Sequence, residues 1–250
     1  MKATSINALE SSFRATGKDA FGKKFNLSEV QVNVPGFIEK LKLIDCIREN
    51  NDKSFFNEEI LPKSKIVIHF TAGYLKGDIA TLTQPGNHVS VPFVIARSGD
   101  IYNLWASKYW SYHLGKNAVG GNTEMSSKTI AIEISNIGCL KKSGNNLVTT
   151  YSNTDVYCSL DEITFYAKVP AYRGFEYFAT FTQAQYHSLK LLLKFLSNKY
   201  NIPYTFLPTN KRFNLFTPAE ASSFKGICTH VNFRADKWDI GPAFDWSKIE

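Results

Sequence analysis

Several features that would place this chain of 250 residues in a familiar class are missing from it. No stretch of about 18 consecutive apolar residues occurs, so we expect no transmembrane helix and no insertion into a membrane. Residues 1–24 lack the apolar segment of a secretory signal, which predicts synthesis in the cytoplasm. No run of lysine and arginine is long enough to suggest an arm that binds nucleic acid.

Cysteine is also scarce. The four cysteines (Cys46, Cys139, Cys158 and Cys228) are far apart, and none belongs to a C-x-x-C pair. A disulfide framework is therefore not expected in a chain of this size, and buried reduced thiols are the simpler interpretation. Cys228 lies two residues before His230, so in a strand both side chains would face the same side. Its thiol is therefore an alternative metal ligand.

The composition is that of a folded protein with a basic surface. Hydrophobic residues make up 44% of the chain and aromatic residues 14%, which is enough to build a sizeable core. The formal net charge of +7 favours an anionic partner such as nucleic acid, a membrane surface or an acidic cell wall. An ordinary solvated surface is the alternative interpretation, because the basic residues are scattered along the chain.

Short β-branched runs predict the strands of one sheet. Residues 65–70 read KIVIHF, a buried strand, and residues 89–105 predict two strands around the turn at 98–100. Residues 129–136 alternate isoleucine with other residues, so Glu133 is expected on the face opposite the isoleucines.

Helices are predicted by apolar spacing and by capping signals. Residues 36–50 carry apolar side chains at helical spacing and predict an amphipathic helix. Thr182 and Gln185 form a capping box before a leucine-rich helix, and residues 217–220 form a second capping box. The order of elements predicts an α/β fold with a central mixed β-sheet and helices packed on it.

The chain is expected to have two parts. Residues 1–60 predict a partly helical N-terminal extension, for which a docking role is one interpretation. Residues 61–250 predict the main domain, with an insertion at about 141–180 that is expected to hold loops and one hairpin.

Three residues far apart in the sequence suggest a metal site. His69 lies near the end of a predicted strand, and His230 and Asp239 lie in the terminal segment CTHVNFRADKWDIGPAFDW. Two imidazoles and one carboxylate are a common catalytic zinc set, which leaves a fourth position for water. Chance is the alternative, since the chain has five histidines scattered along it.

Three further residues are candidates for catalysis or substrate binding. A carboxylate inside a strand of isoleucines is costly without a partner or a role, so Glu133 is a candidate general base. Lys237 is a candidate for stabilising an oxyanion, and His113 for lining a substrate cleft. The alternatives are an exposed glutamate on a solvated sheet face and a surface lysine, and for His113 a role as a further hydrogen-bond donor.

Six segments occur in the order found in one known family: IVIHFTAG, SGDIYNLW, SYHLG, TIAIEISN, FTQAQYHSL and THVNFRADKWDIGPAFDW. Together they resemble the zinc-dependent N-acetylmuramoyl-L-alanine amidases, a family that includes phage endolysins, muropeptide-recycling amidases and peptidoglycan recognition proteins. The resemblance covers residues 65–246 except the insertion. It implies zinc ligands at His69, His230 and Asp239, a catalytic carboxylate at Glu133 and a transition-state lysine at Lys237.

The resemblance also implies that His113 lines the substrate groove. Arg173, in the aromatic part of the insertion, is a candidate partner for a carboxylate of the stem peptide, although the insertion's aromatic residues could simply cover the sheet. Some relatives carry a tyrosine-histidine pair where this chain has Val91 and Pro92. Glu133 would then act where those relatives use tyrosine.

The resemblance implies a peptidoglycan hydrolase that cleaves the amide bond between N-acetylmuramic acid and L-alanine. The basic charge favours a phage-type lytic enzyme, which acts on the cell wall after its release. A cytosolic muropeptide-recycling amidase and a non-catalytic peptidoglycan-binding module stay open as alternatives. We expect a monomer that binds Zn²⁺ and peptidoglycan or muropeptides, and that binds no nucleic acid.

Overall fold

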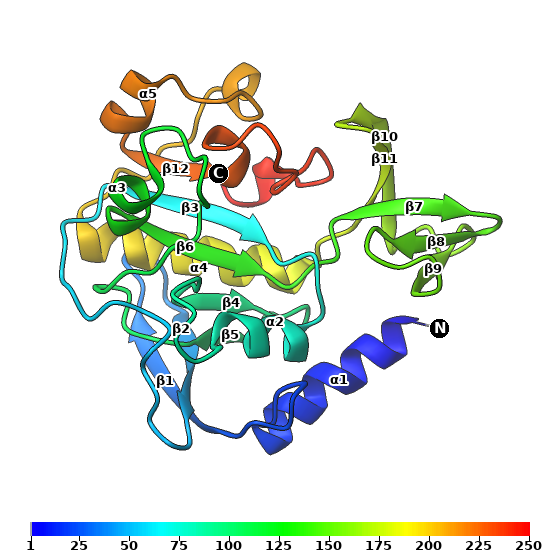
Figure 1. Cartoon of the computed structure of the whole chain (residues 1–250), viewed down its shortest axis with the longest axis horizontal. Helices are drawn as coiled ribbons and strands as arrows, with labels where there is room; N and C mark the ends of the chain where they lie inside the picture. The colour runs from blue at the N-terminus through cyan, green and yellow to red at the C-terminus, as the bar shows by residue number, and fades with distance from the viewer. Residues whose placement is uncertain (1) are drawn as a thin grey trace.

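The computed structural model describes residues 2–250 and has a central seven-stranded sheet with the strand order β1-β2-β5-β4-β6-β3-β12 (Figure 1). Strand β3 pairs in parallel with β6 and with β12, whereas β1–β2 and β4–β5 are antiparallel. The sheet is therefore mixed, and the predicted fold class is confirmed. Its strands are β1 (Phe25–Asn33), β2 (Lys40–Arg48), β3 (Lys65–Phe70), β4 (Phe93–Ile95), β5 (Ile101–Asn103), β6 (Thr129–Ile134) and β12 (Gly226–Thr229).

Helices cover both faces of this sheet. Figure 1 shows α4 behind the central strands and α2 in front of them. Both predicted capping boxes are present, at Thr182 with Gln185 and at Thr217 with Glu220. The helices are α1 (Lys2–Thr16), α2 (Leu75–Leu82), α3 (Asn122–Ser127), α4 (Gln183–Tyr200) and α5 (Pro218–Ser223), with short 3₁₀ turns at Thr209–Lys211, His230–Asn232 and Trp246–Lys248.

The two faces of β6 enter different cores. Its isoleucines pack in one cluster with the leucines of α4, several of which are fully buried, and each such leucine contributes about 2 kcal/mol. Ala131 packs in the other cluster, beside Leu75 and Ile79 of α2. The alternation places Glu133 on the α2 side, opposite the isoleucines, as predicted.

The helix predicted over residues 36–50 is wrong, because these residues contain strand β2. Leu41 and Leu43 face the core on the α4 side, whereas Ile44 and Cys46 face the opposite core. The strand is buried on both faces and pairs with β1 and β5, so tertiary pairing overrides the helical spacing. The turn at Pro35 and Gly36, which separates β1 from β2, was the sequence signal for a hairpin.

The N-terminal residues pack on the main sheet. Phe13 of α1 is fully buried in the core that contains Tyr102 of β5. The buried carboxylate of Glu10 accepts the backbone N–H groups of Arg97 at 2.8 Å and Ser98 at 3.0 Å, in the β4–β5 turn. The docking role of residues 1–60 stays a prediction.

The insertion is more regular than predicted, since it forms most of a second sheet in place of loops and one hairpin. The strand order is β10-β11-β7-β8-β9. Leu140, Leu147 and Tyr157 fill a small core together with Ile6 of α1, which explains why the segment can form a sheet. Its strands are β7 (Cys139–Ser143), β8 (Asn146–Thr149), β9 (Val156–Ser159), β10 (Tyr166–Tyr172) and β11 (Phe175–Ala179).

The four cysteines are free and buried, as the sequence predicts. Across residues 2–250, none of the helices has both the length and the apolar character needed to cross a bilayer.

Candidate metal centre and active site

The carboxyl ends of three parallel strands meet at one edge of the sheet. Strands β3 and β6 pair in register, with His69 opposite Glu133. Strand β12 lies on the other side of β3, and His230 follows its last residue directly. Parallel pairing therefore brings residues 69, 133 and 230 to the same place, although the sequence separates them widely.

A hydrogen-bonded turn holds His230 after β12. The backbone N–H and the hydroxyl of Thr229 donate to the side-chain oxygen of Asn232, at 2.9 and 3.1 Å. The amide nitrogen of Asn232 donates in turn to the carbonyl of Asn214 at 2.8 Å. The backbone carbonyl of Asp239 accepts from the N–H of Val231 at 3.1 Å, which ties the terminal loop to this turn.

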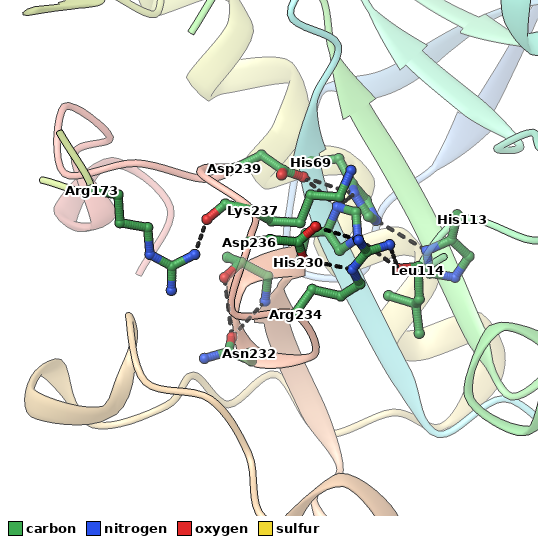
Figure 2. Close-up of polar contacts among 11 residues, drawn as sticks. His69, His113, Leu114, Arg173, His230, Asn232, Arg234, Asp236, Lys237 and Asp239 are labelled. Atoms are coloured by element: carbon green, nitrogen blue, oxygen red, sulfur yellow. Dashed lines mark hydrogen bonds and ion pairs between the residues drawn. The ribbon is translucent and has the colours of Figure 1, made fainter. Parts of the chain in front are cut away.

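His69, His230 and Asp239 converge at this edge (Figure 2). Oδ2 of Asp239 lies 2.9 Å from Nδ1 of each histidine, and the two Nδ1 atoms are 3.1 Å apart. All three side chains are buried. Cys228 lies outside this group, and its thiol contacts the carbonyl of Ile66 at 3.7 Å.

The hydrogen bond made by Nε2 of His230 indicates whether His69, His230 and Asp239 suit a metal ion. Nε2 of His230 lies 2.9 Å from the carbonyl oxygen of Leu114, which can only accept, so Nε2 carries the proton. In the neutral ring, Nδ1 then presents a lone pair to the carboxylate of Asp239. Two acceptors at 2.9 Å repel each other unless a cation or an added proton lies between them.

The spacing of the three atoms also suits zinc. In tetrahedral coordination with bonds of about 2.0 Å, neighbouring ligand atoms lie about 3.3 Å apart, slightly more than the distances found here. Burial, followed by the neighbouring His230, lowers the pKa of His69 to about 4, so this imidazole is neutral at pH 7. Burial alone would raise the pKa of Asp239, but His230 and His69 hold it well below its ordinary value. With Nδ1 of both histidines unprotonated, His69 and His230 offer two lone pairs to a metal ion, and Asp239 offers one negative charge.

Glu133 lies beside this group with an unused acceptor. Its Oε2 atom is buried and has no hydrogen-bond partner among the described residues. Burial, followed by repulsion from Asp239 and Asp78, raises the pKa of Glu133 well above its ordinary value, and Lys237 opposes this shift. A cation held by the histidines would also favour the ionised form. Glu133 borders a cavity of about 110 Å³, lined in addition by Thr71, Asp78, Thr81 and Leu82.

Residues 61–242 match the family model described as N-acetylmuramoyl-L-alanine amidase. The chain belongs to this family. The resemblance in the sequence is thereby confirmed, since the match covers most of the chain and includes His69, His230, Asp239, Glu133 and Lys237.

Three solved structures illustrate what the chain is similar to. AmiD from E. coli, in complex with anhydro-N-acetylmuramic acid-L-Ala-D-gamma-Glu-L-Lys, is 21% identical over 88% of this chain and 64% of its own, with a TM-score of 0.49. A selenomethionine derivative of AmpD is 19% identical over 76% of this chain and 83% of its own, with a TM-score of 0.43. LysC from Clostridium intestinale is 16% identical over 78% of this chain and 89% of its own, with a TM-score of 0.42. The chain thus spans less than two thirds of AmiD. A search of curated proteins found no match.

Lys237 lies near the group formed by His69, His230 and Asp239, and its role in stabilising an oxyanion stays a prediction. It is half-buried in the loop that also carries Asp239, and Figure 2 shows its side chain running toward His69. Its positive charge opposes the raised pKa of Glu133 and contributes to the lowered pKa of His69.

Arg173 connects the inserted sheet to the loop of Lys237. It lies in the β10–β11 turn with a left-handed backbone, at φ 47°. Its guanidinium donates to the backbone carbonyl of Lys237, and its own carbonyl accepts from the indole N–H of Trp238 at 3.4 Å. These reciprocal contacts clip the hairpin to the loop, and contact between Arg173 and a substrate carboxylate stays a prediction.

Replacing Arg173 with alanine is expected to lower the kcat of muropeptide hydrolysis about tenfold while the zinc content of the chain is unchanged. The clip removed by this change is one charge-assisted hydrogen bond, worth about 1.5 to 3 kcal/mol, and Lys237 would lose its fixed position. Steady-state hydrolysis of a soluble muropeptide separates kcat from KM. A raised KM with normal kcat would contradict the positioning role and support direct contact with substrate.

His113 lies behind His69. Nδ1 of His113 is 3.0 Å from Nε2 of His69, and its Nε2 is 2.7 Å from the hydroxyl of Thr129. Both ring nitrogens are therefore engaged within the protein. Sequence reasoning missed Thr129 and the carbonyl of Leu114, because neither a threonine inside a strand nor a backbone carbonyl carries a sequence signal.

Asp78 is a second buried carboxylate near Glu133, and sequence reasoning missed it too. Its Oδ2 accepts from the hydroxyl of Ser135 at 2.8 Å. Burial raises the pKa of Asp78 to about 6, although hydrogen bonds from Ser135 and Thr71 oppose the shift.

The pKa of Asp78 predicts a pH-dependent stability. An acid whose pKa is raised on folding, here from 3.8 to about 6, stabilises the folded state below pH 3.8, and this stability is lost as the pH rises through 6. Asp78→Asn should remove that dependence, which amounts to about 3 kcal/mol. Urea unfolding of the zinc-free protein between pH 4 and 7 measures it. An unchanged pH slope in the variant would contradict the assignment.

Proposed function

We propose that this chain is a zinc-dependent hydrolase that cleaves the amide bond between N-acetylmuramic acid and L-alanine of the stem peptide. The observation that carries the proposal is the convergence of two imidazole lone pairs and a carboxylate beside the unpartnered Glu133. Membership in the N-acetylmuramoyl-L-alanine amidase family supports the reaction and the substrate. A binding module would have no use for the buried base.

Each residue of the site has a role in this reaction. His69, His230 and Asp239 would hold zinc, which supplies a Lewis acid that polarises a carbonyl and lowers the pKa of water. Glu133 would accept a proton from the attacking water and deliver it to the departing amine of L-alanine. Lys237 would stabilise the negative charge that develops on the carbonyl oxygen.

The biological setting that we propose is that of a phage-type lytic enzyme. The net charge of +7 suits an intact, anionic cell wall and raises the local concentration of the enzyme there. A cytosolic recycling amidase would act on soluble fragments instead, and a binding module would cleave neither substrate.

The test is digestion of purified sacculi and of soluble muropeptides, with and without a chelator, followed by mass analysis of the products. We expect free stem peptides that begin with L-alanine from both substrates, their loss in chelator, and their recovery when Zn²⁺ is added back. Cleavage of soluble fragments alone would favour the recycling role, and binding to sacculi without any product would reject the hydrolase.

A further inference from the structure

A chain of hydrogen bonds runs from His69 in the direction away from His230 and Asp239. Nε2 of His69 lies 3.0 Å from Nδ1 of His113, and Nε2 of His113 lies 2.7 Å from the hydroxyl oxygen of Thr129. That hydroxyl donates to the carbonyl of Met125 at 2.8 Å, with the carbonyl of Ser126 at 3.3 Å. The chain thus ends at backbone carbonyls in the last turn of α3.

The direction of every proton in this chain follows from its last member. A carbonyl only accepts, so the hydrogen of the Thr129 hydroxyl points to Met125. The oxygen of Thr129 must then accept from Nε2–H of His113. The lone pair on Nδ1 of His113 must in turn accept from Nε2–H of His69. Nδ1 of His69 is left with its lone pair facing Asp239.

Burial and the packing of the two histidine rings shield these hydrogen bonds from water. His69 and Thr129 are buried, and the rings of His69 and His113 meet edge to face, at 88°. With both rings neutral, the carbonyl of Met125 at the end of the chain sets the order of donors and acceptors.

We propose that His113 and Thr129 are positioning residues that fix Nδ1 of His69 as a zinc ligand and strengthen zinc binding. Partners that hydrogen-bond the second ring nitrogen of a metal-ligating histidine set its tautomer and raise its basicity. His230 obtains the same support directly, from the carbonyl of Leu114. The inference rests on the zinc centre of the proposed function and is independent of the substrate.

This role differs from that of lining the substrate groove. A groove residue needs a ring nitrogen that is free for the substrate, and both nitrogens of His113 are used inside the protein. Loss of the relay should therefore weaken zinc binding, whereas loss of a groove contact would raise KM and leave zinc affinity unchanged.

The test is the zinc affinity of the full chain, measured by competition with a chromophoric chelator. Thr129→Val keeps the shape of the side chain and removes the hydroxyl, and it should bind zinc about 10- to 100-fold more weakly than wild type. Thr129→Ser restores the hydroxyl and should bind zinc nearly as tightly as wild type. Thr83→Val is a matched control, because Thr83 is also fully buried and also donates to the carbonyl four residues before it.

A double-mutant cycle tests whether His113 and Thr129 act as one unit. His113→Ala should weaken zinc binding, and adding Thr129→Val to it should cause little further loss. Wild-type zinc affinity in Thr129→Val, or equal weakening in Thr83→Val, would overturn the inference and leave the proposed hydrolase standing. A wild-type chain that binds no zinc would instead overturn the proposed function as well.

Discussion

Replacing His230 with alanine is expected to abolish zinc binding and to lower peptidoglycan hydrolysis by at least about 10³-fold. The change removes the imidazole nitrogen of His230 that faces Asp239. Only His69 and Asp239 then remain as zinc ligands, one fewer than the three protein ligands of a catalytic zinc site. Loss of the Lewis acid costs several kcal/mol of transition-state stabilisation. Elemental mass spectrometry of the purified variant and a sacculus-digestion assay measure the two effects.

Thermal unfolding gives a second measurement of the same site. Zinc binds the folded chain, so added Zn²⁺ should raise the Tm of wild type and leave that of His230→Ala unchanged. His187→Ala is the matched control, because His187 is an exposed histidine of α4 that pairs only with Glu39. Cys228→Ala should also keep its zinc. One zinc ion per chain in His230→Ala would contradict the ligand set.

The parts of the fold that the sequence predicts correctly are those with a local signal. Strand β3 follows from a short β-branched run, and α4 and α5 follow from capping boxes that lie within four residues. The face of Glu133 follows from the period of two along β6. Each of these depends on neighbouring residues, so nothing elsewhere in the chain is needed to infer them.

The errors have a common physical cause. In β2 the apolar residues fit a helix and a strand buried on both faces equally well, and the pairing with β1 and β5 decides between them. The inserted sheet depends on side chains from several short strands that bury one another. Neither the partner strand nor the small core can be read from the segment itself.

In the site, too, the sequence indicates what depends on local motifs and misses what depends on contacts between distant elements. The ordered motifs identify His69, His230 and Asp239, because ligand chemistry restricts which residue types can serve. The relay through Thr129 and the clip at Arg173 depend on distances between elements far apart in the chain. The hydrogen bond from the guanidinium of Arg173 to the backbone of Lys237 is indicated by no spacing in the sequence.

Replacing Glu133 with glutamine should lower kcat about 10² to 10⁴-fold, with KM and zinc content close to those of wild type. Glutamine has the size of glutamate but cannot accept a proton from water at neutral pH. Among the described residues, Oε2 of Glu133 has no hydrogen-bond partner, so the substitution breaks no hydrogen bond at this oxygen. Hydrolysis of a soluble muropeptide over a range of concentrations measures kcat and KM, and near-normal kcat would reject Glu133 as the base.

The stability of the same variant separates a catalytic role from a structural one. Burial raises the pKa of Glu133, so its contribution to stability is present below pH 4.5 and is lost as the pH rises through the raised pKa. Glutamine stays neutral, and the zinc-free variant should therefore be at least as stable as wild type at pH 7. Glu124→Gln, at an exposed glutamate of α3 that pairs with Lys128, is the matched control and should keep full activity. A Glu133→Gln chain that unfolds more easily than wild type would indicate that the residue supports the fold and that its loss of activity is indirect.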